Sequence, residues 1–141
     1  MFSVKKSKVV IDLVEFPESD ADPGMGLWQL CEGQFPILVT GLNVQSILKT
    51  EVHRDQRPYM MDSGYDEDYV IVPTLDSIRT DDIHIGFRLQ HCSINTTPGP
   101  THKMDWRECP LGNDYPYSFP ILLPLRQLDI DTELTFNYNL H

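Results

Sequence analysis

The stretch Thr132-Glu133-Leu134-Thr135-Phe136-Asn137-Tyr138, near the C-terminus, decides the fold more than any other part of the chain. In an extended strand alternate side chains point to the same face, so Leu134, Phe136 and Tyr138 would line one wall with two aromatic rings. An ordinary terminal strand with an apolar face would show the same alternation. The stretch therefore needs support from elsewhere in the sequence.

A second informative segment is Pro23-Gly24-Met25-Gly26-Leu27-Trp28. Two glycines one residue apart allow the main chain to turn sharply or to approach a ligand closely. Such pairs are also common in plain turns. The pair gains weight only from other segments at suitable distances along the chain.

Two more segments lie between these, and the order of all four is informative. Tyr69-Val70-Ile71-Val72 is a β-branched run followed by Leu75, Asp76 and Arg79, and Phe87 to Asn95 reads Phe-Arg-Leu-Gln-His-Cys-Ser-Ile-Asn. In this order and at this spacing, the four segments resemble motifs of the SET-domain protein-lysine methyltransferases: the GxG segment, the strand before the cofactor motif, RFxNHSCxPN and ELTFDY. The resemblance covers about residues 9–139.

The resemblance implies a mostly β, SET-like β-clip fold of short strands, with a C-terminal pseudoknot and one or two short helices. It also implies an S-adenosyl-L-methionine-dependent protein-lysine N-methyltransferase acting on histone tails or another basic protein segment. Tyr138 would be the catalytic tyrosine and Tyr69 the channel tyrosine opposite it. Phe136, two residues before Tyr138, stands at the position that controls the product and would allow di- or trimethylation.

The resemblance further implies a set of residues that hold the cofactor. The first glycine segment would meet its amino-acid end, and the motif around Gln90 would hold its nucleoside. Gln90 departs from the family, in which an asparagine stands, and the residues after His91 are reordered. The implied cofactor-binding residues are Gly24, Met25, Gly26, Trp28, Arg88, Gln90 and His91.

Two other functions are compatible with the sequence. Gln90 and Cys92 could be packing residues in a catalytically inactive SET-like interaction module, which kept the fold and lost the cofactor. Alternatively, the chain could be an unrelated all-β binding domain of the C2 or sandwich kind. Cofactor binding distinguishes the first of these from an enzyme, and the fold excludes or supports the second.

The implied reaction makes clear demands on the residues. Methylation requires a neutral lysine amine, and deprotonating an ammonium group of pKa about 10.4 near pH 7 costs about 4–5 kcal/mol. An apolar aromatic channel lowers this cost by desolvating the charge, and the faces of aromatic rings attract cations. Because the transfer is an in-line displacement, most of the acceleration must come from positioning the reacting atoms.

Composition predicts one domain, residues 1–141, that folds in an intracellular setting. The chain has 141 residues, enough for a single core. No apolar run approaches a membrane span, and no signal-peptide pattern is present. We therefore expect no membrane contact, and the resemblance implies the nucleus. If the chain ends at His141, a partner protein would have to supply the C-terminal lid that a cysteine-rich segment forms in many relatives.

The net charge of −10 argues against direct nucleic-acid binding, which needs basic patches. Acidic clusters, one at Glu18, Asp20 and Asp22 and one at residues 62–68, could steer a basic peptide such as a histone tail toward the domain. They could equally be solvated loops that keep the protein soluble. The charge alone does not decide between these.

The cysteines and histidines give no metal-binding pattern. Cys31, Cys92 and Cys109 are odd in number and irregularly spaced, which argues against a disulfide framework. With His91 and His102 they contain neither a CxxC nor a paired-histidine spacing typical of zinc. We expect no metal, with buried thiols and surface histidines instead.

Residue patterns predict several elements. Strands are expected at 9–14, at Phe35–Thr40 and at Phe119–Leu125, and one edge of the last should be unpaired or irregular because of Pro120 and Pro124. Apolar spacing predicts a helix over Asn43–Val52. Strict alternation over Ile83–Gln90 predicts a strand, whereas the resemblance implies a helical turn there, which we adopt. Loops are expected at Asp55–Asp68 and at 95–117.

Overall fold

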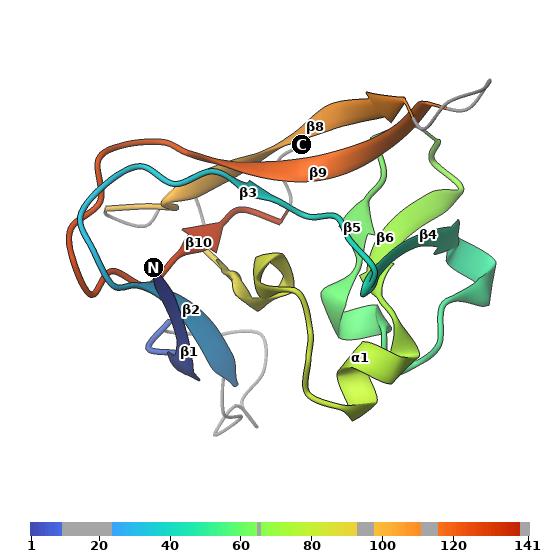
Figure 1. The fold of residues 1–141 in the computed structure, drawn as a ribbon, viewed down its shortest axis with the longest axis horizontal. Helices are drawn as coiled ribbons and strands as arrows, with labels where there is room; N and C mark the ends of the chain where they lie inside the picture. Colours follow the sequence, from blue (N-terminus) through green and yellow to red (C-terminus); the bar gives the residue numbers. More distant parts are fainter. Residues whose placement is uncertain (10–23, 65, 93–97, 111–115, 139–141) are drawn as a thin grey trace, which may run out of the picture. The chain divides into compact units, whose positions relative to one another are not determined.

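The computed structural model describes residues 1–9, 24–64, 66–92, 98–110 and 116–138 (Figure 1). Most of its regular structure is β, as predicted. The helical elements are short: one α-helix, α1 (Leu75–Arg79), and the 3-10 helices η1 (Lys49–Glu51), η2 (Arg57–Tyr59) and η3 (Ile85–Arg88). The strands are β1 (Phe2–Lys6), β2 (Met25–Gln29), β3 (Ile37–Leu38), β4 (Val44–Leu48), β5 (Met61–Asp62), β6 (Tyr69–Pro73), β7 (Gln90–His91), β8 (His102–Pro110), β9 (Pro116–Pro124) and β10 (Thr135–Phe136).

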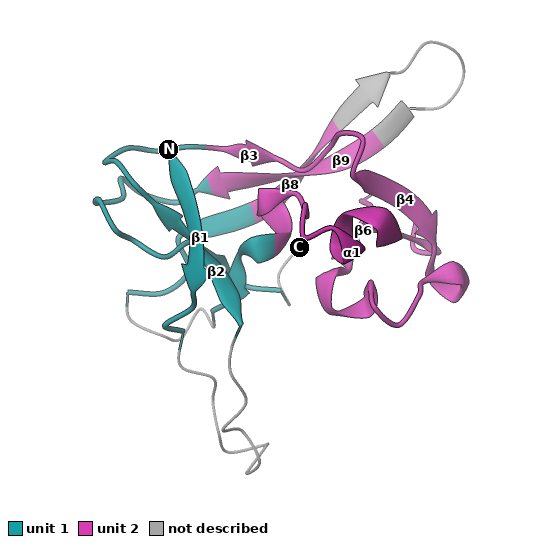
Figure 2. Ribbon diagram, turned by 60° about the horizontal axis from the view of Figure 1, so that its bottom comes forward, with its two compact units in different colours: residues 1–35, 88–103, 124–141 teal, residues 36–87, 104–123 magenta. Residues whose placement is uncertain are grey.

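The chain forms two compact units, each assembled from segments far apart in sequence (Figure 2). Unit 1 contains Met1–Phe35, Arg88–Lys103 and Pro124–His141. Unit 2 contains Pro36–Phe87 and Met104–Leu123. That residues 1–141 act as one domain stays a prediction.

Unit 1 is held together by its C-terminal segment. β1 and β2 form an antiparallel pair, and β10 pairs in parallel with β7 and with the first residue of β8, His102. Leu134, immediately before β10, is fully buried and donates its backbone N–H to the carbonyl of Leu27 in β2 at 2.8 Å. Residues from both ends of the chain therefore share one core.

The order of strands in unit 1 has the arrangement that a C-terminal pseudoknot requires. β10 lies between β7 and β8, which are joined by the segment from Cys92 to Thr101. The C-terminal strand thus inserts between the two strands that flank this connection. Residues 93–97 of the connection lie outside the described residues.

Unit 2 contains an antiparallel sheet in the order β4-β6-β5. β6 is its central strand, and four of its five residues are buried. Val70 and Val72 pack with Val52 and Ile47 in a hydrophobic cluster. The strand predicted over residues 69–72 is confirmed.

The helix predicted over Asn43–Val52 is wrong. The structure has β4 there, with Ile47 opposite Val70 in the ladder to β6, followed by η1. The apolar spacing fits either structure, but Val44 and Ile47 are β-branched and favour a strand. Pairing with the buried central strand β6 decides the outcome, because its backbone groups need partners on both sides.

Between Ile83 and Gln90 the helical turn implied by the resemblance is confirmed over the alternating pattern. The structure has η3, in which Gly86 and Phe87 are buried, and then the short strand β7. A Cβ at Gly86 would lie 2.5 Å from a methyl group of Val39. The alternation of apolar and polar residues over Ile83–Gln90 therefore belongs to a tightly packed turn and not to a strand.

The loop predicted over residues 95–117 is wrong in its second half, where β8 runs. From His102 to Asp105 buried and exposed residues alternate, as in a strand with one covered face. The prolines that suggested a loop, Pro98, Pro100, Pro110 and Pro116, lie before β8 or at strand ends. Proline at a strand end removes no interior ladder bond.

β9 has neighbours on both sides, β3 and β8, so neither edge is wholly unpaired, but pairing along the β3 edge is short, in line with the irregular edge that was expected. The prolines have a smaller effect: β3 pairs only with Ile121 and Leu122, which lie between Pro120 and Pro124. The Phe35–Thr40 strand is correspondingly reduced to the two residues of β3.

Two smaller expectations concern residues 9–14 and Asp55–Asp68. The loop expected over Asp55–Asp68 contains η2 and the two residues of β5. The strand expected at 9–14 falls almost wholly outside the described residues.

Candidate active site

The C-terminal motif and the Gln90-His91 segment lie side by side in unit 1. In the parallel ladder between β10 and β7, Thr135 pairs with Gln90 and Phe136 with His91. The ladder continues through the backbone N–H of Cys92, which donates to the carbonyl of Phe136 at 3.1 Å. Two segments that the resemblance assigns to one site are therefore adjacent.

Tyr138 closes this corner of the unit. Its backbone N–H donates to Nδ1 of His91 at 3.0 Å, so a neutral His91 carries its proton on Nε2. The ring of Tyr138 lies 5.0 Å from the ring of His91 and 4.6 Å from that of Phe136, centroid to centroid. Phe136 is buried, whereas Tyr138 is 40% exposed. The three rings form an aromatic cluster with one accessible member.

The hydroxyl of Tyr138 is fixed by the fold. It donates a short hydrogen bond to the backbone carbonyl of Leu89. Burial raises the pKa of Tyr138 to about 12, so the hydroxyl keeps its proton at neutral pH. The hydroxyl hydrogen is used in the hydrogen bond to the Leu89 carbonyl. The lone pairs of the phenol oxygen can therefore accept a hydrogen bond from another group.

The glycine segment joins the same corner through Gln90. Its side-chain Nε2 donates to the carbonyl of Met25 at 2.9 Å. Met25 is 43% exposed, and a Cβ at Gly24, where φ is +80°, would meet nothing within 4 Å. The structure therefore brings together three of the four segments singled out in the sequence.

Gly26 lies directly against the side chain of Glu133. A Cβ there would fall 2.5 Å from Oε2 of Glu133. The Glu133 carboxylate accepts from the Ser7 hydroxyl at 2.6 Å and from the backbone N–H of Lys8 at 2.7 Å. Glu133 thus ties the C-terminal motif to the glycine segment, a role that sequence reasoning missed although the residue belongs to the quoted motif.

Trp28 lies in β2 and is 7% exposed. Lys5 Nζ lies 4.5 Å and Lys8 Nζ 5.8 Å from the centre of its ring, within cation–π range. Within the part of the chain that the structure describes, the buried indole Nε1 has no hydrogen-bond partner. Trp28 is therefore the buried end of the glycine segment, covered by two lysine side chains.

The other two predicted site residues, Arg88 and Tyr69, belong to different units. Arg88 is half-buried at the end of η3 and belongs to unit 1. Tyr69 begins β6 in unit 2 and is 37% exposed. Its role opposite Tyr138 stays a prediction.

His102, expected at the surface, is in fact buried. Its Nε2 lies 3.1 Å from the carbonyl of Phe35 and its Nδ1 2.8 Å from the Thr101 hydroxyl. The Thr101 hydroxyl also accepts from the backbone N–H of Thr135 in β10 at 2.8 Å. His102 therefore belongs to a polar network that supports the C-terminal strand. The sequence could not reveal this role, because a single histidine carries no pattern that shows whether it is buried.

The metal and cysteine expectations concern the same region. Among the residues that the structure describes, no three His, Cys, Asp or Glu side chains are placed to hold a metal ion. Cys31 is exposed and Cys92 partly exposed, so the buried thiols expected at these positions are not found. The side chain of Cys109 lies outside the described residues.

Among the residues that the structure describes, no helix is long and apolar enough to span a membrane.

No protein-family model matches the chain, and a search of curated proteins gives no significant match. Among solved structures, the chain resembles a Plasmodium falciparum protein described as a "putative histone methyltransferase", with a TM-score of 0.59. The match covers 98% of this chain and 92% of the other at 14% identity. The two chains share a fold. This likeness agrees with the predicted SET-like, mostly β architecture.

The residues of unit 1 fit S-adenosylmethionine in part. The open, exposed backbone at Gly24 and Met25 can approach a small polar group, and the aromatic faces of Tyr138 and His91 suit a sulfonium. Gly26 offers no such opening because Glu133 occupies it. Contact through the backbone is therefore expected at Gly24 and Met25.

Proposed function

We propose that this protein is an S-adenosylmethionine-dependent protein-lysine N-methyltransferase, acting on histone tails or another basic protein segment in the nucleus. The observation that carries the proposal is the convergence at one corner of unit 1 of Tyr138, Phe136, Gln90-His91 and Met25. The histone-methyltransferase description of the P. falciparum neighbour supports the same chemistry.

When bound, S-adenosylmethionine supplies an electrophilic methyl group. Gly24, Met25, Gln90 and His91 would hold the cofactor, and it would give the methyl group to the neutral lysine nitrogen and leave as S-adenosylhomocysteine, with the proton of the methylated amine released to water. Tyr138 is not the base, because its pKa of about 12 keeps it protonated. Its oxygen instead accepts a hydrogen bond from the lysine amine and so directs the nitrogen lone pair.

The fixed position of Tyr138 is what makes this role effective. The hydroxyl is bonded to Leu89, and the backbone N–H to His91, so the oxygen has little freedom. Holding a nucleophile in a near-attack geometry contributes more to such a displacement than acid–base catalysis does. The buried ring of Phe136 adds an apolar wall that disfavours the ammonium form of lysine.

A methyl-transfer assay tests the proposal. The full chain is incubated with isotopically labelled S-adenosylmethionine and a histone H3 tail peptide, and the peptide is analysed by mass spectrometry. We expect label on a lysine of the peptide. A peptide with each lysine replaced by arginine is the control. Absence of transfer to histone tails and to other basic peptides alike would contradict the proposal.

A second candidate function, a catalytically inactive SET-like interaction module, is favoured by one observation. A Cβ on Gly26, the second glycine of the cofactor motif, would meet the Glu133 side chain, so packing gives a reason for the glycine that needs no cofactor. A module of this kind would bind a basic peptide without binding S-adenosylhomocysteine. Parallel titrations with peptide and with S-adenosylhomocysteine distinguish the two functions.

Replacing Gln90 should weaken cofactor binding. The Gln90 side chain holds the Met25 carbonyl, so Gln90→Ala removes a hydrogen bond of about 0.5–1.5 kcal/mol and should raise the dissociation constant of S-adenosylhomocysteine about two- to tenfold. Gln90→Asn, which keeps the amide on a shorter stem, should lie between the two proteins. Calorimetric titration measures all three. Equal affinity of wild type and Gln90→Ala would show that Gln90 does not position the glycine segment.

Phe136 should control the number of methyl groups transferred. Its ring has no hydroxyl that could anchor a water molecule beside Tyr138, so the methylated amine has room to react again. We expect di- or trimethylated peptide from the wild type and mostly monomethylated peptide from Phe136→Tyr, by mass spectrometry at long reaction times. Because Phe136 is buried, the melting temperature of the variant must be measured as a control. Monomethylated product alone from the wild type would refute this role.

A further inference from the structure

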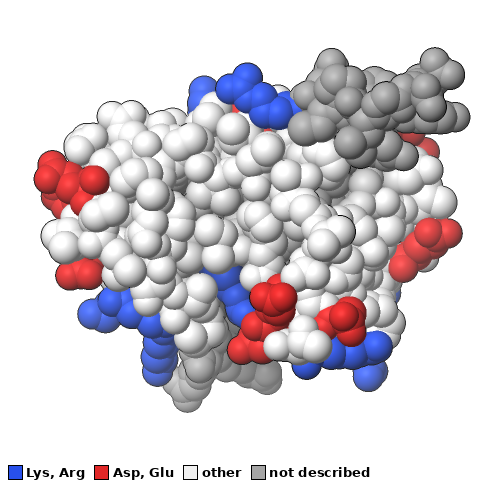
Figure 3. Space-filling view, viewed as in Figure 1, with Lys and Arg blue, Asp and Glu red and all other residues white. Residues whose placement is uncertain are grey.

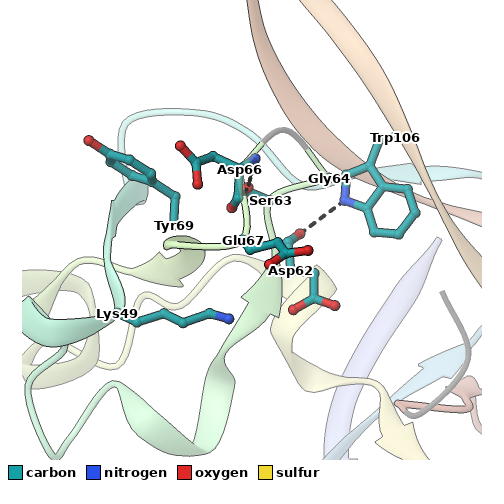
Figure 4. A pocket seen from close by; sticks show the side chains of 8 residues that line it. All are labelled: Lys49, Asp62, Ser63, Gly64, Asp66, Glu67, Tyr69 and Trp106. Carbon is teal, nitrogen blue, oxygen red and sulfur yellow. Dashed lines mark hydrogen bonds between the residues drawn. The ribbon is translucent and has the colours of Figure 1, made fainter.

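Unit 2 contains a pocket whose lining includes one predicted site residue, Tyr69, beside residues that have no part in the proposed reaction. Its volume is about 370 Å³, and Figure 4 shows its lining: two aromatic rings, three carboxylates and one ammonium group. The lining residues are Lys49, Asp62, Ser63, Gly64, Asp66, Glu67, Tyr69 and Trp106. We propose that this pocket binds an arginine side chain of a basic polypeptide.

The Trp106 ring forms a rigid wall of the pocket. Its indole N–H donates to the backbone carbonyl of Asp62 at 2.9 Å. Gly64, with φ of +69°, lies so close that a Cβ would overlap the indole ring, so only glycine fits both the backbone conformation and the contact. A ring held at its nitrogen and against its face presents a fixed aromatic surface and loses little freedom when a ligand stacks on it.

The acidic wall is also fixed. The Ser63 hydroxyl donates to the carbonyl of Asp66 at 2.9 Å and accepts from its N–H at 3.2 Å. The Asp66 carboxylate accepts from the backbone N–H of Asp68 at 2.9 Å. Glu67 and Asp66 are nevertheless exposed to solvent. The Asp66 carboxylate is therefore held near the pocket, and both carboxylates remain accessible to a cation.

The charge of the lining favours a positive ligand. Asp62, Asp66 and Glu67 outweigh the single positive charge of Lys49. On the face drawn in Figure 3, acidic side chains form separate small groups interspersed with Lys and Arg.

Arginine fits this lining better than lysine does. Its planar guanidinium stacks on aromatic rings and donates two parallel hydrogen bonds to a carboxylate. The lysine ammonium is compact and strongly hydrated, and it cannot stack in this way. Trp106 and Tyr69 offer the rings, and Glu67 and Asp66 the carboxylates. This binding does not require methyl transfer and would also serve the inactive module.

Nuclear magnetic resonance can test the pocket by itself, because the chain has only two tryptophans. The indole N–H of Trp106 reports on the pocket, and that of Trp28 in unit 1 is an internal reference. Acetyl-Gly-Arg-Gly-amide is titrated into the full chain, with the corresponding lysine and citrulline peptides as controls. Citrulline has nearly the shape of arginine without its charge.

We expect the Trp106 signal to shift with the arginine peptide, less with lysine and not with citrulline, while Trp28 stays unchanged. A Trp106 signal that does not move, or that moves equally with citrulline, would overturn the proposal. A stronger response to lysine would overturn the assignment to arginine. None of these outcomes depends on S-adenosylmethionine, so they are separate from the fate of the proposed reaction.

Two charge variants sharpen the test because they should act in opposite directions. Glu67→Gln should weaken arginine-peptide binding about two- to fivefold, and Lys49→Gln should strengthen it by a similar factor. Glu32→Gln, which removes the same charge from an exposed position in unit 1, should leave it unchanged. Equal effects of Glu67→Gln and Glu32→Gln would show that the attraction is not located in the pocket.

Discussion

Tyr138→Phe should reduce methyl transfer by two orders of magnitude or more while the fold and cofactor affinity are retained. The substitution removes one hydroxyl group and keeps the ring that packs against Phe136 and His91. Without the phenol oxygen the lysine amine loses the acceptor that orients it, and loss of orientation alone can cost about a hundredfold in rate. The rate of methyl transfer to a histone H3 tail peptide at saturating cofactor measures the effect.

Two control measurements accompany Tyr138→Phe, which also removes the hydrogen bond from the hydroxyl to the Leu89 carbonyl. Losing the bond to Leu89 should destabilise the protein by about 0.5–1.5 kcal/mol, which urea unfolding detects. The affinity for S-adenosylhomocysteine should change little, because the hydroxyl acts on the amine. A variant that folds, binds S-adenosylhomocysteine and transfers methyl groups at the wild-type rate would show that Tyr138 is not the catalytic tyrosine.

The second large effect concerns stability below neutral pH. Burial, reinforced by the nearby charge of Arg126 and opposed by the carbonyl of Phe35, lowers the pKa of His102 in the folded protein. Burial also lowers the pKa of His84. An unfolded chain therefore takes up these protons first. The associated stability is complete above the ordinary histidine pKa of about 6.5 and is lost as pH falls toward the lower folded values.

We accordingly expect the free energy of unfolding to fall between pH 7 and pH 5, by up to about 1.4 kcal/mol per pH unit for each proton taken up. Urea unfolding at several pH values measures the slope. His84→Gln and His102→Gln should each reduce it, and the double variant should remove most of it over this range. An unchanged slope in the double variant would assign the effect to other groups.

His102→Gln should also lower stability at pH 7. It disturbs buried hydrogen bonds to Phe35 and Thr101, with an expected cost of about 1–3 kcal/mol. Because Thr101 is hydrogen-bonded to Thr135, loss of the His102 hydrogen bonds should also destabilise β10. The sequence predicted none of this, since a single histidine between Thr101 and Lys103 has no pattern that reveals its burial.

The sequence predicted best where a motif and a buried strand coincide. The strand at Tyr69–Val72 was found because a continuous β-branched run suits a central strand. The three segments of unit 1 were singled out through their order along the chain, and their role as a cofactor site stays a prediction. Their contacts, such as that from Gln90 to Met25, join residues far apart in sequence and could only be inferred through the resemblance.

The errors arose where local patterns fit two structures. Residues 43–52 have a spacing compatible with a helix, but pairing with β6 makes them a strand. β8 was missed because prolines outside its interior suggested a loop. Glu133 was seen only as part of a motif, since its contact with Gly26 depends on how the C-terminus meets β2. In each case tertiary packing, which short-range patterns do not contain, determined the outcome.

Isothermal titration calorimetry with S-adenosylhomocysteine tests the central claim most directly. It uses the full wild-type chain and requires no knowledge of the target lysine. A functional cofactor site at Gly24, Met25, Gln90 and His91 predicts saturable one-to-one binding that Gln90→Ala weakens. No heat of binding at millimolar S-adenosylhomocysteine, from protein shown to be folded, would contradict the methyltransferase and leave the inactive interaction module.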